Sequence, residues 1–404
     1  MVRSFFVPGR IELFGKHVDY AGGPSLTCAI DEGITAELEP LSRPVLEVVD
    51  AHSGRTAQVP LRRDARTSHA NGGAYISAVA RRLARDFAPL REGVRVRTTS
   101  TLPRSAGLSS SSAFITLLTI AVADANALPE RSTWKRNIPT RLALAEYCGA
   151  IEMGGPFGAF AGERGVGTRG GAQDHTAILC NEAGTVGAFR YLPAELFGRA
   201  PFPAHWRILV AVSGVRATKT GRARDDYNRA SDMVRAMLEE WNISQGRADL
   251  SLASAVRSSV DARERLRELA AHSNDAPWHL ARIEQFLAET ERLVPQALAA
   301  IGEADGAALG RLAVESQQRA ETALRNQVPE TMFLARSAMA AGAHAASAFG
   351  AGFGGAVWAI VDTQDAADVR ARWSAAYAKE FPMRSAKAAW LQVRPGAGVR
   401  WTGV

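Results

Sequence analysis

The segment PGRIELFGKHVDYAGG, residues 8–23, passes from a strand-like pattern to a polar turn within a few residues. Ile11 and Leu13 alternate with polar side chains between two glycines, which predicts a short strand. A polar set then leads into a turn that ends at a glycine pair; the set consists of Arg10, Glu12, Lys16, His17 and Asp19. Polar groups at a strand end beside glycines can line a binding site, although an exposed turn with solvated charges would show the same pattern.

A second segment, LPRSAGLSSSSA at residues 102–113, combines small residues with serines. It follows a predicted strand at residues 93–99 and opens an apolar helical run at residues 113–123. Such an arrangement can cradle phosphate, because unpaired backbone N–H groups and the helix dipole both favour an anion at a helix N-terminus. The alternative is an ordinary serine N-cap on a core helix. No lysine follows the last glycine, so the segment is not a Walker A loop.

The third segment, AFGAGFGGA at residues 348–356, runs directly into a predicted strand at residues 357–361. Its small residues allow the backbone to pass close to a ligand or to a neighbouring loop. On its own this glycine motif specifies neither.

The apolar pattern changes character near residues 201–203. Before that point, strand-like runs at residues 46–49 and 93–99 alternate with helical ones such as residues 75–87. Afterwards the pattern is mainly helical, with candidate helices at residues 225–241, 280–301 and 307–323. Two late strands, at residues 356–361 and 388–393, bracket a helix at residues 366–381. We therefore expect an α+β half, followed by a helical half with its own small sheet.

Composition narrows the class of protein. The 404 residues suffice for two domains of about 100 to 200 residues each. The longest apolar stretch, residues 113–123, is about half of what a bilayer requires, and the apolar run after Arg3 is too short for a signal peptide, so we expect a cytoplasmic protein with no membrane partner. The net charge of +7 suits the binding of phosphorylated small anions, whereas the scattered basic residues do not suggest nucleic acid. The widely spaced cysteines are expected to be buried thiols; they are Cys28, Cys148 and Cys180.

The three glycine-rich segments, in this order, are more specific than any one of them. They resemble the ordered motifs of the GHMP kinases, the superfamily of galactokinase, homoserine kinase, mevalonate kinase and phosphomevalonate kinase. Within it, galactokinase is the best match, since the first segment resembles its signature Gly-Arg-x-Asn-Leu-x-Gly-Glu-His-x-Asp-Tyr-x-Gly-Gly. GAQDH at residues 171–175, DYNR at 226–229 and VRPGAG at 393–398 resemble three further galactokinase segments. The resemblance therefore covers nearly the whole chain.

The resemblance implies an α+β, two-domain GHMP-kinase architecture. Residues 1–200 would form the N-terminal domain, of the ribosomal S5 domain 2-like type, with the nucleotide loop and the acceptor residues. Residues 201–404 would form a ferredoxin-like C-terminal domain with added helices, and ATP and acceptor would meet between the two. The implied assembly is a monomer or a homodimer.

The implied activity is Mg²⁺-dependent transfer of the γ-phosphoryl group of ATP to a hydroxyl, most simply the anomeric one, of a sugar or sugar acid. One alternative is a GHMP kinase for a cyclitol, an amino sugar or another alcohol. Another is a non-catalytic sugar-binding sensor, against which the presence of Arg10 and Asp174 argues.

For the nucleotide, the resemblance places ATP in the serine loop, which comprises Gly107, Leu108, Ser109, Ser110 and Ser111. Ser111 matches the serine that contacts magnesium, and Ser112 stands where the family usually has alanine. The second magnesium contact is matched by Glu152, with Glu146 as the alternative, because residues 154–164 look like an insertion before Asp174. A hydroxyl and a carboxylate suit Mg²⁺, which prefers hard oxygen ligands and keeps several waters.

For the transfer step, Asp174 matches the catalytic aspartate and would accept or merely orient the proton of the attacking hydroxyl, while Arg10 would stabilise the transferred group. Structural alternatives are a surface turn for Asp174 and a strand-edge salt bridge for Arg10. His17, Asp19 and Tyr227 match sugar-hydroxyl contacts, although His17 could equally be a buried histidine bonded to backbone and Tyr227 could be core packing on a helix.

Two positions depart from the galactokinase pattern: Lys16 replaces a glutamate and Glu12 replaces an asparagine. Lys16 is expected at the acceptor. An ammonium group has only donors, so it favours an acceptor with a carboxylate or phosphate. A neutral sugar with altered hydroxyl geometry remains an alternative, as does a Lys16 that pairs with Glu12 or another local acid and never touches the ligand.

Overall fold

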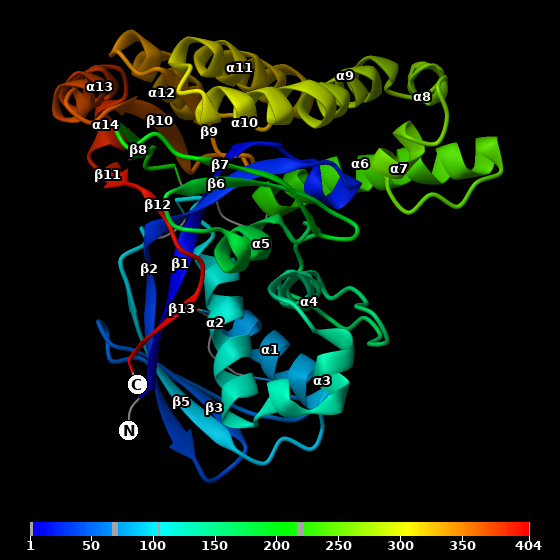
Figure 1. Cartoon of the computed structure of the whole chain (residues 1–404), viewed down its shortest axis with the longest axis vertical. Coiled ribbons are helices and arrows are strands. Elements are labelled where there is room, and N and C mark those ends of the chain that lie inside the picture. Colours follow the sequence, from blue (N-terminus) through cyan, green and yellow to red (C-terminus); the bar gives the residue numbers. More distant parts are fainter. Residues whose placement is uncertain (1–2, 67–71, 104–105, 216–221, 404) are drawn as a thin grey trace.

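The computed structural model describes residues 3–66, 72–103, 106–215 and 222–403, apart from the side chains of residues 222–227 and 403. Two sheets organise these residues, and helices cover each of them (Figure 1). The last N-terminal strand of the larger sheet ends at Pro201, and the first strand of the smaller sheet begins at Trp206. The domain boundary near residue 200 stays a prediction.

The larger sheet is mixed, with the order β13-β1-β2-β5-β3-β4 and with β6, β7 and β12 joined at the β2 side. Only the β3–β5 pair among the described pairings is parallel. Its strands are β1 (Arg3–Phe14), β2 (Ser25–Leu41), β3 (Val45–Asp50), β4 (Thr56–Pro60), β5 (Gly93–Ser100), β6 (Thr185–Arg190), β7 (Glu195–Pro201), β12 (Pro395–Gly396) and β13 (Arg400–Gly403). The last two strands return from the C-terminal half, so both ends of the chain lie at one edge of this sheet (Figure 1).

One face of the larger sheet is covered by helices of the N-terminal half (Figure 1). They are α1 (Gly73–Asp86), α2 (Ser110–Ala125), α3 (Ser132–Asn137), α4 (Arg141–Met153) and α5 (Gln173–Cys180). Buried Leu117, Leu118 and Val122 of α2 belong to the same core as the strands beneath them. The helix predicted at residues 113–123 begins three residues earlier than expected, at Ser110, so the last serines of the loop form its first turn.

The smaller sheet is antiparallel, in the order β11-β8-β10-β9, and confirms the small sheet expected in the second half. Its strands are β8 (Trp206–Val212), β9 (Ala345–Ala348), β10 (Ala356–Asp362) and β11 (Ala389–Val393). The helices that pack against it are α11 (Gly306–Arg319), α12 (Pro329–Ala340) and α13 (Ala366–Glu380), followed by the short α14 (Pro382–Ser385). Trp373 and Tyr377 of α13 are fully buried against this sheet.

A helical arm extends to one side of the molecule (Figure 1). It consists of α6 (Arg222–Gln245), α7 (Leu252–Val256), α8 (Ala262–Ala271) and α9 (Ala276–Ala288), and α9 continues through a π-helical turn at Glu289–Leu293 into α10 (Val294–Gly302). Its apolar core includes Val18 and Ala21 of the first glycine-rich segment, so the arm is anchored on that turn. Within the described residues no helix is long and apolar enough to cross a bilayer. Of the three free cysteines, Cys28 and Cys148 are buried as predicted and Cys180 is half-buried.

Candidate active site

Arg10 and Asp174 meet although they are 164 positions apart in the chain. Arg10 lies on β1 and is 4% exposed, and Asp174 lies in the first turn of α5. The Nε and Nη2 atoms of Arg10 approach Asp174 Oδ1 at 2.8 and 2.7 Å, while Nη1 donates to the carbonyl of Gly107 at 2.6 Å. One guanidinium therefore joins the predicted catalytic carboxylate to the serine loop, and its burial makes the pair more than a surface salt bridge.

The serine loop has the backbone geometry of an anion cradle. Gly107 and Ser109 both have positive φ, 79° and 57°, which turns the chain sharply into α2. Ser109 is the N-cap of α2, yet its side chain makes no capping hydrogen bond, and its buried Oγ has no partner among the described residues. The ordinary serine N-cap is therefore not formed here. The N–H groups in the first turn of α2 therefore receive no hydrogen bond acceptor from the Ser109 side chain. An anion-binding helix end needs such uncapped N–H groups.

Glu152, the candidate magnesium ligand, lies near the end of α4 and is 6% exposed. Ser112 Oγ approaches Glu152 Oε2 at 2.8 Å and Asp174 Oδ2 at 3.1 Å, so one hydroxyl bridges the two carboxylates. Glu146, the alternative ligand, accepts a hydrogen bond from the backbone of Ala194 instead. In the described ranges, no group of three or more His, Cys, Asp or Glu side chains could hold a metal alone. A magnesium ion bound partly by phosphate oxygens needs no such group.

The turn after β1 is buried and is held by α9. Arg282 donates to the carbonyl of His17 at 2.5 Å, and Gln285 donates to the carbonyl of Lys16 at 2.9 Å. His17 Nδ1 lies 2.9 Å from the hydroxyl of Tyr20. Burial, with the nearby Arg282 charge, lowers the pKa of His17 to about 3. The imidazole is thus neutral over the physiological pH range.

Two further carboxyl groups lie beside the Arg10–Asp174 pair. Burial, with the charge of Asp174, raises the pKa of Asp19 to about 6. Burial raises the pKa of Glu12 to about 8, against the opposing charge of Arg10. Gln173 donates to Glu12 Oε2 at 2.5 Å, and Glu12 Oε1 has no partner among the described residues. At neutral pH we expect Glu12 to be largely protonated, because an unpaired charge is costly in such a setting.

The third glycine-rich segment closes over this cluster from the C-terminal half. A Cβ atom added to Gly350 would lie 2.3 Å from Glu12 Oε1, so only glycine allows the loop to approach this carboxyl group. Phe349 packs against Gly107 of the serine loop, where an added Cβ would lie 3.1 Å from its ring. Asn326 holds the loop by donating to the carbonyl of Gly350 at 2.7 Å. All three glycine-rich segments therefore converge on one site.

Comparison with known proteins agrees with this convergence. Family models match residues 3–40 as a galactokinase galactose-binding signature, residues 74–182 as a GHMP kinase N-terminal domain and residues 297–379 as a GHMP kinase C-terminal region. The chain belongs to the galactokinase family of GHMP kinases. It is thus an α+β GHMP-family kinase of two-domain architecture, as the motifs predicted, and the family uses ATP.

The relatives of this GHMP kinase are distant but nearly full-length. A galactokinase of Roseiflexus sp. (strain RS-1) is 27% identical over 376 residues, which cover 92% of this chain and 86% of that protein. A galactokinase of Thermococcus kodakarensis is 26% identical over 396 residues, or 98% of each chain. The crystal structure of Lactococcus lactis galactokinase complexed with galactose matches 100% of this chain and 95% of its own with a TM-score of 0.77, at 20% identity. That likeness establishes the shared fold.

Lys16 of this GHMP kinase is bound by residues of the C-terminal half. Its side chain is fully buried, and Nζ donates to Ser316 Oγ at 2.9 Å and to Ser347 Oγ at 2.6 Å, both in the C-terminal half. Ser316 in turn donates to Glu289 Oε1 at 2.6 Å. Burial lowers the pKa of Lys16, and the Glu289 charge opposes that shift. This geometry favours the alternative in which Lys16 is linked to a local acid, here Glu289 through Ser316, and the expected contact with an acceptor stays a prediction.

Tyr227 falls in α6, but its side chain lies outside the described residues, so its predicted sugar contact stays a prediction. The next residue, Asn228, ties α6 to the loop before Asp174. It donates to the carbonyl of Gly167 at 3.1 Å and accepts from the backbone of Arg169 at 2.9 Å. The motif around Tyr227 therefore lies next to the chain that leads to Asp174.

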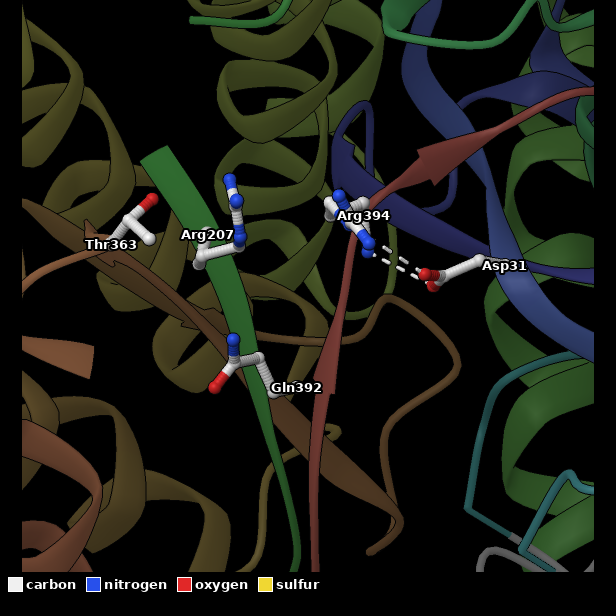
Figure 2. Close-up of a pocket in the computed structure, with 5 residues that line it drawn as sticks. All are labelled: Asp31, Arg207, Thr363, Gln392 and Arg394. Carbon is white, nitrogen blue, oxygen red and sulfur yellow. Dashed lines mark hydrogen bonds and ion pairs between the residues drawn. The ribbon is translucent and has the colours of Figure 1, made fainter. Parts of the chain in front are cut away.

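A separate cavity of about 280 Å³ lies where the smaller sheet meets β2 (Figure 2). It is lined by Asp31, Arg207, Thr363, Gln392 and Arg394. Its two arginines are already engaged, Arg394 with Asp31 and Arg207 with the carbonyl groups of Ala204 and Trp206. None of its lining residues belongs to the three glycine-rich segments, so this cavity is not the site described above.

Sequence reasoning missed Ser112 and His175 as parts of the site. The only signals were their positions, since Ser112 extends the serine run and His175 directly follows Asp174. It also missed Arg282 and Gln285, which hold the turn after β1 from more than 250 positions away. No local pattern marks such residues.

Proposed function

We propose that this galactokinase-family enzyme transfers the γ-phosphoryl group of Mg²⁺-bound ATP to the anomeric hydroxyl of a sugar. The observation that carries the proposal is the buried guanidinium of Arg10, which binds the Asp174 carboxylate and the carbonyl of Gly107 at once. A catalytic carboxylate and a phosphate cradle are thereby held at a fixed separation, and positioning is the main requirement of phosphoryl transfer.

The serine loop supports ATP binding. The unsatisfied Ser109 Oγ and the uncapped first turn of α2 offer donors to phosphate oxygens. Ser111 and Glu152 would hold the magnesium ion, and both offer the hard oxygen that it prefers. When bound, the ion supplies neutralisation of the charge on the phosphate groups.

In the transfer step, Asp174 would accept the proton of the attacking hydroxyl or orient it. Arg10 would stabilise the charge that develops on the transferred group, since its Nη1 donates to the carbonyl of Gly107 in the proposed phosphate-binding loop. Asp19 would accept hydrogen bonds from sugar hydroxyls. Its carboxylate is fixed by the backbone N–H of Gln173, at 3.4 Å, next to the catalytic aspartate.

The acceptor class that the site favours is a neutral sugar. The site holds the carboxylates of Asp19 and Asp174 and one guanidinium, that of Arg10. Glu12 adds no negative charge while it is protonated, and Lys16 donates to serines of the C-terminal half. An anionic acceptor would meet these carboxyl groups with little compensating charge. The acceptors to compare with a neutral sugar are a sugar acid, a cyclitol and an amino sugar.

The decisive experiment measures ADP release from Mg²⁺-ATP with galactose, galactosamine, galacturonate or myo-inositol and with no acceptor. The proposal predicts the highest kcat/KM for a neutral sugar and loss of that activity in Asp174→Asn. If no acceptor raises ADP release above the acceptor-free rate, the proposed transfer to a galactose-like sugar fails. A preference for galacturonate over galactose would overturn the assignment of a neutral acceptor.

A further inference from the structure

Beneath the serine loop, four buried side chains from three helices form one hydrogen-bonded chain. Ser112 and Thr116 lie one turn apart on α2 and so share a face. Ser112 Oγ lies 2.8 Å from Glu152 Oε2 on α4. His175 on α5 lies between Glu152 and Thr116. Its Nε2 is 3.0 Å from Glu152 Oε2, and its Nδ1 is 3.0 Å from Thr116 Oγ1.

With Glu152 ionised and His175 neutral, the hydrogen bonds of this chain fix its hydrogens. An ionised Glu152 only accepts, so His175 must carry a hydrogen on Nε2 to bond with it. In a neutral imidazole Nδ1 is then an acceptor, and the hydroxyl of Thr116 supplies its hydrogen. Each of these hydrogen bonds then joins a donor to an acceptor, which is what a buried network requires for rigidity.

Two features make this chain more than core packing. First, Ser112 and His175 converge on the same oxygen, Oε2 of Glu152, and so fix the orientation of that carboxylate. Second, the Ser112 hydroxyl also lies 3.1 Å from Asp174 Oδ2. Ser112 has one proton for two carboxylates, so its hydroxyl can donate to either of them and links the two groups across a part-buried gap.

We propose that Ser112 and His175 are positioning residues that hold Glu152 for magnesium and tie it to the catalytic Asp174 as one unit. The inference rests on the proposed kinase function and deepens it, because it names what orients the metal ligand. Outer-shell partners of this kind change metal affinity by about 10- to 100-fold when they are lost, since a ligand that must be ordered on binding binds more weakly.

The test uses Mn²⁺ as the probe, with ADP present, and follows free Mn²⁺ by electron paramagnetic resonance. The variants are Ser112→Ala, His175→Leu and His175→Gln, the last of which keeps a donor near the position of Nε2. Thr176→Val on the same helix is the matched control, because the buried Oγ1 of Thr176 has no partner among the described residues. Melting temperatures verify that each variant is folded, and Ser112→Ala is the smallest change should His175→Leu fail to fold.

We expect Ser112→Ala and His175→Leu each to weaken Mn²⁺ binding about tenfold, and His175→Gln to recover most of that loss. Ser112→Ala should also lower kcat with little change in the acceptor KM, because Ser112, unlike His175, has a hydrogen bond to Asp174. The double variant should lose less than the product of the single losses, since both residues act through one oxygen.

Wild-type metal affinity in folded Ser112→Ala and His175→Gln, with unchanged kcat, would overturn this inference and leave the kinase proposal standing. If wild-type ADP binding is itself independent of Mn²⁺, the magnesium site of the proposed function fails, and this inference fails with it. Equal losses in Thr176→Val would also count against it, because they would show a general response to changes in α5.

Discussion

The burial of Lys16 shows how a residue inside a sequence motif can lie away from the role expected at its position. Its side chain is fully buried, and its Nζ is linked to Glu289 through the hydroxyl of Ser316. Glu289 also accepts from the backbone of Gly15 at 2.9 Å, so the pair pins the turn after β1 to the C-terminal half. Of the roles that the sequence left open for Lys16, the structure favours a link to a local acid within the protein.

Lys16→Met should destabilise the protein by about 3 kcal/mol or more, because it leaves the buried Glu289 carboxylate without the amino group that is linked to it through Ser316. The double variant Lys16→Met/Glu289→Gln should recover part of that loss, since it removes both charges. Urea unfolding of the four chains of this cycle measures the coupling between the two residues.

Acceptor preference is the control for this prediction. If Lys16 is structural, the ratio of kcat/KM for galactose and galacturonate stays the same in Lys16→Met, whatever its stability. A variant of unchanged stability and altered acceptor ranking would instead assign Lys16 to the acceptor pocket.

The partners of Lys16 also mark a limit of sequence reasoning. Ser316 and Ser347 lie 300 and 331 positions away, on elements whose approach depends on how the two halves dock. By contrast, the pairing of Arg10 with Asp174 was predictable, because the resemblance to the GHMP kinases implied it.

At the scale of a single element, the N-terminus of α2 carries the nucleotide proposal. The sequence predicted strand, loop and helix correctly here, with β5 and α2 flanking the serine loop. It did not predict that Ser109 adopts a left-handed conformation and leaves the helix uncapped. That conformation depends on contacts from elsewhere, such as the hydrogen bond from Arg10 N to the carbonyl of Leu108 at 3.3 Å.

Ser111→Ala should weaken the binding of Mg²⁺-ADP about tenfold, because it removes one hard oxygen ligand from the proposed site. Binding of ADP without magnesium should change little. Calorimetric titrations with and without Mg²⁺ separate the two effects.

Ser132→Ala provides the matched control, since Ser132 is an exposed first-turn serine of α3 in the same half. It should leave both titrations unchanged. A Ser111→Ala variant with wild-type magnesium dependence would show that this hydroxyl does not contact the metal.

On the scale of the whole molecule, the site exists only where the two halves and the arm meet. β1 contributes Arg10, α5 contributes Asp174, the loop after β9 contributes Gly350, and α9 holds the turn that carries His17. The sequence predicted both sheets and the helical character of the second half. It could not predict that β12 and β13 return to the larger sheet, because such short strands carry no pattern of their own.

The burial of His17 where these parts meet predicts that this residue contributes to acid unfolding. Its folded pKa of about 3 lies below the ordinary value, so between about pH 6.5 and 3 the unfolded chain binds a proton that the folded chain does not. Stability therefore falls as the pH falls through this window, by about 1.4 kcal/mol per pH unit for this one group.

His17→Asn removes that proton while tolerating the positive φ of 57° at this position. From pH 6.5 to 5.0, wild type should lose about 2 kcal/mol more unfolding free energy than the variant. Asp19 acts in the opposite direction in both chains, since its raised pKa favours folding at low pH. Identical pH slopes for the two proteins would show that His17 titrates normally in the folded state.

Phosphoryl transfer assisted by Asp174 is tested most directly by ³¹P NMR of the reaction of Mg²⁺-ATP with galactose. Wild type should form ADP and one phosphate monoester, coupled to the anomeric proton, in equal amounts. Asp174→Asn should form the same ester about 10² times more slowly, with nucleotide affinity nearly unchanged. Formation of the ester at the wild-type rate by Asp174→Asn, or release of inorganic phosphate in place of the ester by wild type, would contradict the account.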